Sequence, residues 1–213
     1  MQTITLQLTP IEARVIASLA EKSLTTPQYY PMTVNAILLA ANQKNSRHPV
    51  MKLNEGDVGS ALNRMEQEKL CTRDDTLGRV PKWRHQFQHQ LLLQRPPFAV
   101  LVTLLLRGPQ TVAELRANAA GLGGPGDAAG VEAVLKDLAD RAAPLVVLLL
   151  RASGQKEARY AHTLCGPPAP FVAIASESPP GSEPPQESSA LAALEEKILA
   201  LDARVAALEQ RAG

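Results

Sequence analysis

The sequence has few cysteines and few aromatic residues, and its opposite charges nearly cancel. The two cysteines, Cys71 and Cys165, lie far apart and form no CxxC pair. This argues against a disulfide framework or a zinc ribbon and favours a reducing compartment, by default the cytoplasm. Aromatic residues make up 3% of the chain, too few for the stacking platforms that bind single-stranded nucleic acid. A formal net charge of +1 lacks the strongly positive field of many nucleic-acid-binding proteins.

Long apolar runs and targeting patterns are also missing. The longest apolar stretches, LVVLLL and VLVTLLL, are far shorter than the roughly 20 residues that span a bilayer. The stretch MQTITLQLTP has neither the basic nor the apolar region of a signal peptide. The sequence therefore predicts a cytoplasmic protein with no membrane partner. Its hydrophobic content of 45% is ordinary for a chain with a buried core.

Patterns typical of catalysis or metal binding are absent from the sequence. There is no Walker A, GxGxxG, HExxH or GxSxG pattern. The stretch GLGGPG at 121–126 lacks the Lys-Ser/Thr of a phosphate loop and is better interpreted as a connection between helices. His85 and His89 would share one face of a predicted strand, but no third ligand accompanies them. We therefore predict no metal, no cofactor and no enzymatic activity.

The far end of the chain contains two clear patterns. Residues 166–188 are rich in Pro and Ser and predict a flexible linker. In 189–213, apolar residues alternate at intervals of three and four, which is typical of a coiled-coil seam; they are Leu191, Leu194, Ile198, Leu201, Val205 and Leu208. Leu at every d position, with Leu, Ile and Val at a, favours a parallel pair of helices. We predict a homodimer, the alternative being one amphipathic helix that lies on the protein's own body.

The body of the chain, about residues 1–165, repeats itself. Late in each half stands a similar short pattern, WRHQF at 83–87 and YAHTL at 160–164, each preceded by basic residues. The elements predicted upstream of these two patterns follow the same order in both halves. The sequence therefore predicts two related domains in tandem.

The first two helices of each half are predicted from their starting residues. A first helix is expected at about 9–22, capped by Thr9 and followed by Pro at the first helical position, and its counterpart at about 97–107. Second helices are expected in MTVNAILLAAN and QTVAELRANAA, capped by Thr33 and Thr111. A Glu three residues after Thr111 matches a capping box.

The third helix of each half is predicted from apolar spacing. Residues 54–70 and 127–141 both place apolar residues at intervals of four and three. A β-hairpin is expected after each, at about 70–87 and 145–164. Three helices followed by a two-stranded hairpin is the order of a winged helix.

The predicted fold class is therefore mainly α with small β-hairpins (α+β). Two tandem winged-helix domains are expected at 1–90 and 91–165. The Pro/Ser-rich linker, 166–188, and the coiled-coil helix, 189–213, follow them.

Several stretches resemble the YceH-like family of uncharacterised bacterial proteins. They are LTPIEARVIASLAEK, TTPQYYPMTVNA, NQKNSRHPVM, LLLRGPQTVAELR and EARYAH, and together they cover nearly the whole body. The chain departs from the family pattern at Gln86, where the pattern has Arg. The resemblance implies tandem winged helices, with a C-terminal coil in some relatives, and implies no biochemical activity.

The loop ANQKNSRHPVMK at 41–52 is polar and basic and contains no acid. It precedes the third helix, and the basic first hairpin follows that helix, so the two are expected to flank one face and clamp phosphates. The predicted nucleic-acid-binding residues are Lys44, Arg47, Lys52, Arg79, Lys82 and Arg84. In the alternative interpretation the loop is an ordinary corner, where amides satisfy backbone groups and Arg47 pairs with an acid.

The third helices are acidic on balance, which opposes an approach to phosphates. In the first half four acids stand against two bases: Glu55, Asp57, Glu66 and Glu68 against Arg64 and Lys69. The sequence therefore predicts binding of double-stranded DNA mainly through phosphate contacts, with little readout of bases. The alternative is a scaffold or adaptor that binds another protein. No target sequence, regulated process or partner follows from the residues.

Overall fold

The computed structural model describes residues 6–75, 80–149 and 157–167. All of them belong to one compact unit, Met1–Ala173. A second unit, Ile174–Gly213, lies outside the described residues. The predicted coiled-coil helix and nearly all of the predicted linker therefore also lie outside them.

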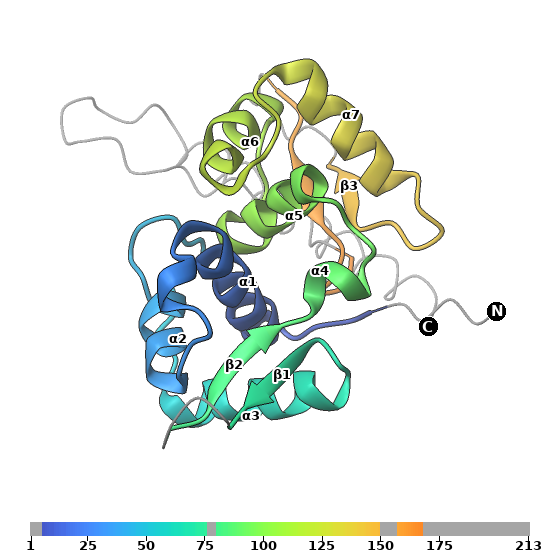
Figure 1. Cartoon of the computed structure of the whole chain (residues 1–213). Coiled ribbons are helices and arrows are strands. Elements are labelled where there is room, and N and C mark those ends of the chain that lie inside the picture. The colour runs from blue at the N-terminus through green and yellow to red at the C-terminus, as the bar shows by residue number, and fades with distance from the viewer. Residues whose placement is uncertain (1–5, 76–79, 150–156, 168–213) are drawn as a thin grey trace, which may run out of the picture. The chain divides into compact units, whose positions relative to one another are not determined.

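The chain is mainly helical, with two small antiparallel strand pairs (Figure 1). The elements of the first half are α1 (Pro10–Thr25), the short η1 (Pro27–Tyr29), α2 (Val34–Ala41), α3 (Glu55–Gln67), β1 (Cys71–Asp74) and β2 (Lys82–His85). Those of the second half are α5 (Arg95–Arg107), α6 (Val112–Ala119), the short η2 (Ala120–Leu122), α7 (Ala128–Ala139), β3 (Val146–Leu148) and β4 (Tyr160–His162), and α4 (Phe87–Gln90) joins the halves. The same order of three main helices and a strand pair thus occurs twice.

The helix starts follow the predicted capping residues. The side chain of Thr9 accepts a hydrogen bond from the backbone N–H of Glu12, and the Glu12 carboxylate accepts one from Thr9. Thr111 and Glu114 form the same reciprocal pair at the start of α6, and Thr33 caps α2. Each cap satisfies backbone donors that have no partner within the helix, so these starts are fixed by local sequence.

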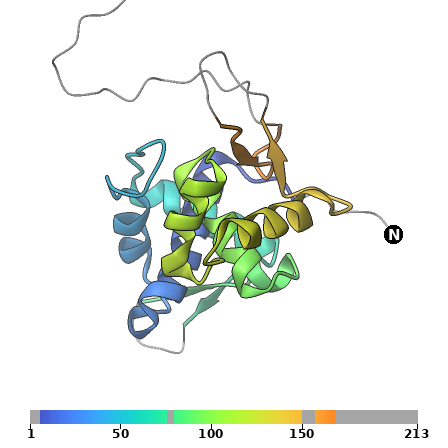
Figure 2. The same cartoon turned by 90° about the horizontal axis from the view of Figure 1, so that it is seen from above.

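The two halves pack on each other through α1 and α5. In α1 every residue from Glu12 to Ala20 is buried, and in α5 every residue from Phe98 to Leu106 is buried. A helix that is apolar almost all round must be covered on all sides. The partners supply that cover, because α1 also contacts α2 and α3, while α5 contacts α6 and α7 (Figures 1 and 2).

A short bridge recurs at the same place in each half. Met32, just before α2, exchanges two backbone hydrogen bonds with Trp83 of β2, at 2.8 and 3.2 Å. Gln110, just before α6, does the same with Tyr160 of β4, at 2.8 and 3.0 Å. These bridges fix the strand pair of each half against the segment that opens its second helix.

Two details differ from the prediction. The strand expected to reach residue 87 ends at His85, because Gln86 leaves the extended conformation (φ −112°, ψ 6°) and α4 begins at Phe87. His85 and His89 therefore do not share a strand face. The first helix of the second half begins at Arg95, before the expected start, because prolines fit the first helical turn. Within the described residues, no helix combines the length and apolarity needed to cross a bilayer.

Candidate nucleic-acid interface

The loop between α2 and α3 is held from inside by Arg47. The Arg47 side chain is completely buried and donates to both carboxylate oxygens of Glu21 on α1, at 2.6 and 3.2 Å. It also donates to the carbonyl oxygens of Ala40 and Ser46, at 3.1 and 2.9 Å. Burial alone raises the pKa of Glu21, but the hydrogen bonds and charge of Arg47 outweigh it and hold this pKa below its ordinary value. Arg47 therefore pins the loop to α1 and is not placed to contact a phosphate.

Arg14 and Asn42 anchor the same loop at its two ends. Arg14, on α1, is buried and donates to the carbonyl oxygens of Ala41 and Pro49, at 3.3 and 2.7 Å. Burial, with a smaller contribution from the charge of Arg47, lowers the pKa of Arg14 to about 10. The Asn42 amide closes the base of the loop by exchanging two hydrogen bonds with the backbone of Leu53, at 2.8 and 2.9 Å. The corner interpretation therefore describes Arg47 and Asn42 correctly.

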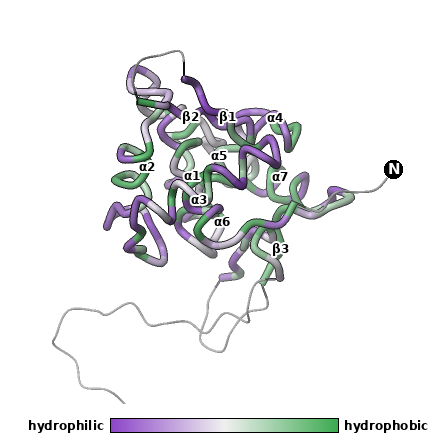
Figure 3. The backbone as a smooth tube through the Cα atoms, turned by 90° about the horizontal axis from the view of Figure 1, so that it is seen from below, coloured by the Kyte–Doolittle hydropathy of each residue, from purple (hydrophilic) through white to green (hydrophobic). Residues whose placement is uncertain are grey.

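The remaining predicted loop residues are exposed to solvent. Lys44 and Lys52 lie on either side of the buried Arg47. Between them the loop contacts the second half, because the backbone N–H of His48 donates to the carbonyl oxygen of Leu106 at 2.8 Å. Figure 3 shows this polar loop in purple directly after α2. Of the three predicted cations of the loop, the two flanking lysines are therefore available to an anionic partner.

The first strand pair carries basic residues that have acidic neighbours. Arg84 is exposed and lies 3.5 Å from Asp74, with its guanidinium 5.9 Å from the centre of the Tyr30 ring. Lys82 is half-buried. Arg79 lies outside the described residues. Exposed ion pairs of this kind contribute about 0–1 kcal/mol, so a stronger anion can displace the carboxylate at little cost.

The outward face of α3 is uncharged. Val58, Leu62 and Met65 turn inward and are fully buried. The residues on the opposite side, at intervals of three and four, are exposed; they are Gly56, Ser60, Asn63 and Gln67. Ser, Asn and Gln side chains both donate and accept hydrogen bonds, so they suit base edges. The total charge of the helix does not indicate this uncharged face. The spacing of the apolar residues of α3 does, because it defines the buried side and therefore the opposite, exposed side.

Three acids in or directly after α3, namely Asp57, Glu66 and Glu68, are engaged beside this face, whereas Glu55 in the first turn is exposed. Asp57 forms the capping box with Asn54. A carboxylate oxygen of Glu66 accepts from the backbone N–H of Arg73 on β1 at 3.1 Å. Glu68 lies 3.6 Å from Arg64, which also pairs with Glu12 at 3.2 Å. These contacts hold the three carboxylates at the ends and flanks of α3.

Two histidines at the ends of the second strands are largely buried and neutral. The ring of His85 stacks on Phe98 at 5.5 Å, and its Nε2 lies 2.9 Å from the Ser23 hydroxyl. Burial, with a smaller contribution from His89, lowers the pKa of His85 to about 4. Burial likewise lowers the pKa of His162 to about 4. Both imidazoles therefore serve as packed core groups at neutral pH.

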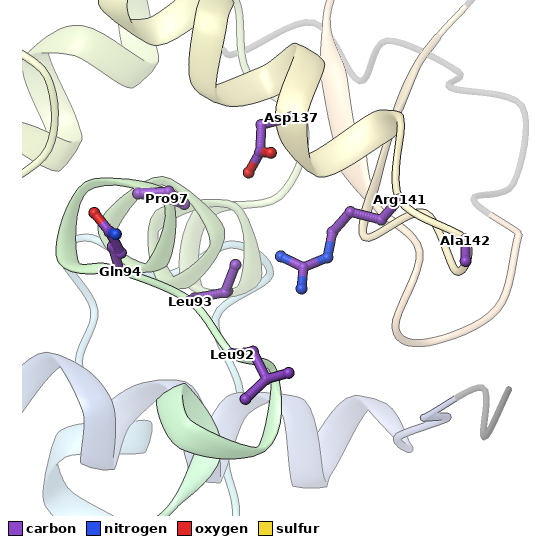
Figure 4. A pocket seen from close by; sticks show the side chains of 7 residues that line it. All are labelled: Leu92, Leu93, Gln94, Pro97, Asp137, Arg141 and Ala142. Carbon is purple, nitrogen blue, oxygen red and sulfur yellow. The ribbon is translucent and has the colours of Figure 1, made fainter. Parts of the chain in front are cut away.

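A cavity of about 620 Å³ opens beside the segment that precedes α5 (Figure 4). Asp137 of α7 points toward it, and Arg141 extends across it, donating to the carbonyl oxygen of Leu91 at 2.8 Å. The seven residues that line it include one carboxylate and one guanidinium but no imidazole, thiol or hydroxyl. This cavity therefore does not assemble a nucleophile with a base.

Comparison with known proteins gives a consistent family assignment. Residues 8–155 match the model of a family described as "Protein of unknown function, DUF480". A UPF0502 protein of Burkholderia orbicola (strain MC0-3) is 42% identical over 207 residues, which cover 96% of this chain and 87% of that protein. A UPF0502 protein of Pelobacter propionicus (strain DSM 2379) is 49% identical over 155 residues, 73% of this chain and 71% of that protein. The family match and both relatives agree with the resemblance to uncharacterised bacterial proteins given above.

Proposed function

The chain belongs to the DUF480 family of bacterial proteins, and we propose that it is a non-enzymatic cytoplasmic protein that binds double-stranded DNA. In this proposal each half is a winged helix, in which α3 and α7 are the third helices and the two strand pairs form the wings. Helix α3 enters the major groove and the first wing follows the backbone, as in many winged-helix proteins.

The observation that carries the proposal is the uncharged outward face of α3. Ser60, Asn63 and Gln67 offer donors and acceptors without a repelling carboxylate among them. Phosphate contacts come from Lys44 and Lys52 of the loop and from the wing residues Lys82 and Arg84. Because Arg47 is buried, the proposed clamp has fewer cations than the sequence suggested.

The proposal also includes a homodimer of the chain. The heptad pattern of 189–213 would place its apolar residues along one face of the predicted helix, and the same face of a second copy could cover them. Two copies of the chain would present two α3 helices to one duplex. A dimer would thereby offset the modest number of cations in each copy.

Fluorescence anisotropy with a labelled mixed-sequence duplex tests DNA binding directly. We expect binding at low salt that weakens steeply toward physiological salt, because phosphate contacts release counterions. A flat titration at low salt would overturn the proposal. A random pool of duplexes, selected by repeated binding, then reports whether α3 reads bases.

Removing both exposed loop lysines tests the phosphate clamp. The double variant Lys44→Gln and Lys52→Gln is expected to weaken binding to all sequences alike. It should lower the slope of log K against log salt by about 0.9 for each phosphate that is no longer neutralised. Arg116→Gln, at an exposed position of α6, to which the proposal assigns no DNA contact, is the control and should leave the slope unchanged. Loss of binding to one sequence only would show that these lysines read bases instead.

Deleting residues 189–213 tests the proposed coil. We expect the dimer to dissociate at protein concentrations at which the full chain stays paired, because the deletion removes the whole apolar seam. Sedimentation velocity over a dilution series measures this. An unchanged sedimentation mass at the lowest concentration would mean that the dimer is held elsewhere or that the chain is a monomer.

A protein-binding scaffold is the second candidate, and exposed apolar residues favour it. Tyr29 is 75% exposed, and Leu39, on the outer side of α2, is 66% exposed. Large exposed apolar groups are enriched where proteins meet. If no duplex binds at low salt, we expect Leu39→Asp to disrupt a protein complex without changing the fold.

A further inference from the structure

A polar cavity of about 270 Å³ lies where the loop of the first half meets the second half. Three segments far apart in the sequence form its walls: Ser46–His48 of the loop, the end of α5 with one side of α6, and Arg159 before β4. All of the lining residues except Asn118 belong to stretches on which the family resemblance rests. The volume is below the roughly 300–1,000 Å³ of pockets for drug-sized ligands, so it suits a small polar group.

The walls of this cavity are held in place by close contacts. Gly108 ends α5 with φ +73°, a left-handed conformation that favours glycine. A Cβ atom at this position would lie 3.3 Å from Cδ2 of His48. The buried Arg47 holds the carbonyl oxygen of Ser46 at 2.9 Å, and the His48 backbone donates to α5. The cavity is thus preformed by groups that have little freedom to move.

The side chains that line the cavity carry more positive than negative charge. Three guanidinium groups and one carboxylate line it. The carboxylate of Glu114 accepts from both terminal nitrogens of Arg159, at 2.9 and 3.0 Å, and from the backbone of Thr111. Arg47 is paired with Glu21 outside the cavity. Among the described residues Arg107 has no carboxylate partner, and its Nη2 donates instead to the Ser46 hydroxyl at 2.7 Å.

Ser46 reinforces this arrangement. Its backbone has φ +62°, in the left-handed region that a non-glycine residue adopts only at a cost. The contacts of Arg47 with its carbonyl and of Arg107 with its hydroxyl hold it there. Strained residues of this kind concentrate where a side chain must be presented to a ligand. The hydroxyl accepts from Arg107, so its own hydrogen is available to another acceptor.

We propose that this cavity is a binding site for a phosphate dianion, either free or as the terminal group of a small phosphomonoester. The guanidinium of Arg107 donates through its planar fork, and the Ser46 hydroxyl and the His48 side chain stand beside it. A bound dianion neutralises the unmatched charge of Arg107 and joins the loop of the first half to α5. The proposal goes beyond DNA binding and does not depend on it.

Titration of the full chain in phosphate-free buffer tests the site. Inorganic phosphate and glycerol 3-phosphate are added in separate arms, each against sodium chloride of matched ionic strength, and backbone amide shifts are followed by NMR. We expect saturating shifts at residues 46–48 and at 107, 108 and 110, with a Kd on the order of 1 mM or lower. If only glycerol 3-phosphate saturates, the site takes monoesters. If phosphate saturates equally well, the dianion alone is recognised.

Two variants separate binding from folding. Arg107→Gln is expected to weaken binding by about tenfold or more, the size of one charge-assisted hydrogen bond. Ser46→Gly removes the hydroxyl but suits the left-handed backbone, so it should weaken binding without loss of stability. Arg116→Gln, an exposed site on α6 outside the cavity, should bind as the wild-type chain does. Shifts that sodium chloride reproduces, or equal affinity in Arg107→Gln, would overturn the proposal.

Discussion

Replacing Glu21 with Gln is expected to lower the free energy of unfolding by about 3–5 kcal/mol. The substitution keeps the size of the side chain but removes the charge that balances the buried guanidinium of Arg47. That guanidinium has no exposed surface, so water cannot replace the missing carboxylate. A buried charge without its partner is among the few changes that destabilise a protein this strongly. Urea denaturation at neutral pH measures the effect.

Two further variants isolate the cause. Arg73→Gln breaks the ion pair with Asp75, in which both side chains are about half exposed, and should cost less than about 1 kcal/mol. Combining Glu21→Gln with Arg47→Met removes both charges and should recover much of the stability, because no unpaired charge is then left buried. If Glu21→Gln costs no more than Arg73→Gln, the ion pair does not hold the loop.

The elements that sequence predicted well are those set by local residues. The capping box of Thr111 and Glu114 spans three positions, so the start of α6 follows from neighbours along the chain. The apolar spacing of α3 likewise places Val58 and Leu62 in the core. In contrast, no local rule marks the end of β2 at His85, where the chain turns so that Phe87 becomes fully buried.

The candidate site was harder to predict because contacts between distant segments decide which of its residues are buried and which are exposed. Arg47 and Lys44 stand three positions apart in one basic loop, yet one is buried and the other exposed. The difference arises from Glu21, 26 positions before Arg47, and from Arg14, which occupies the space beneath the loop. The cavity at Arg107 joins residues separated by up to 113 positions, from Ser46 to Arg159, so composition and spacing carried no sign of it.

Acidification from pH 7 to pH 5 is expected to destabilise the folded chain by about 2 kcal/mol for each of His85 and His162. Both have pKa values lowered to about 4 in the folded chain, against an ordinary value of 6.5. Between these values the unfolded chain binds protons that the folded chain does not. Stability therefore falls as the pH falls through this window. The pKa of Glu21 is lowered from 4.5, so the contribution of its carboxylate to the free energy of unfolding is lost mainly below pH 5. It therefore adds little to the change between pH 7 and pH 5.

Single substitutions separate the two imidazoles. His162→Gln should reduce the fall in stability between pH 7 and pH 5 by about half, and the double variant with His85→Gln should remove most of it. His85→Gln also removes the contact with Ser23 and the stacking on Phe98, so it lowers stability at both pH values. The diagnostic quantity is therefore the difference between the two pH values rather than either free energy alone. His48→Gln is the control, because His48 is exposed in the folded chain whereas His85 and His162 are largely buried. Burial of a neutral imidazole opposes its protonation, so removing both imidazoles must reduce the fall in stability between pH 7 and pH 5. If this fall keeps its wild-type size in both single variants and in the double variant, other groups cause the acid sensitivity.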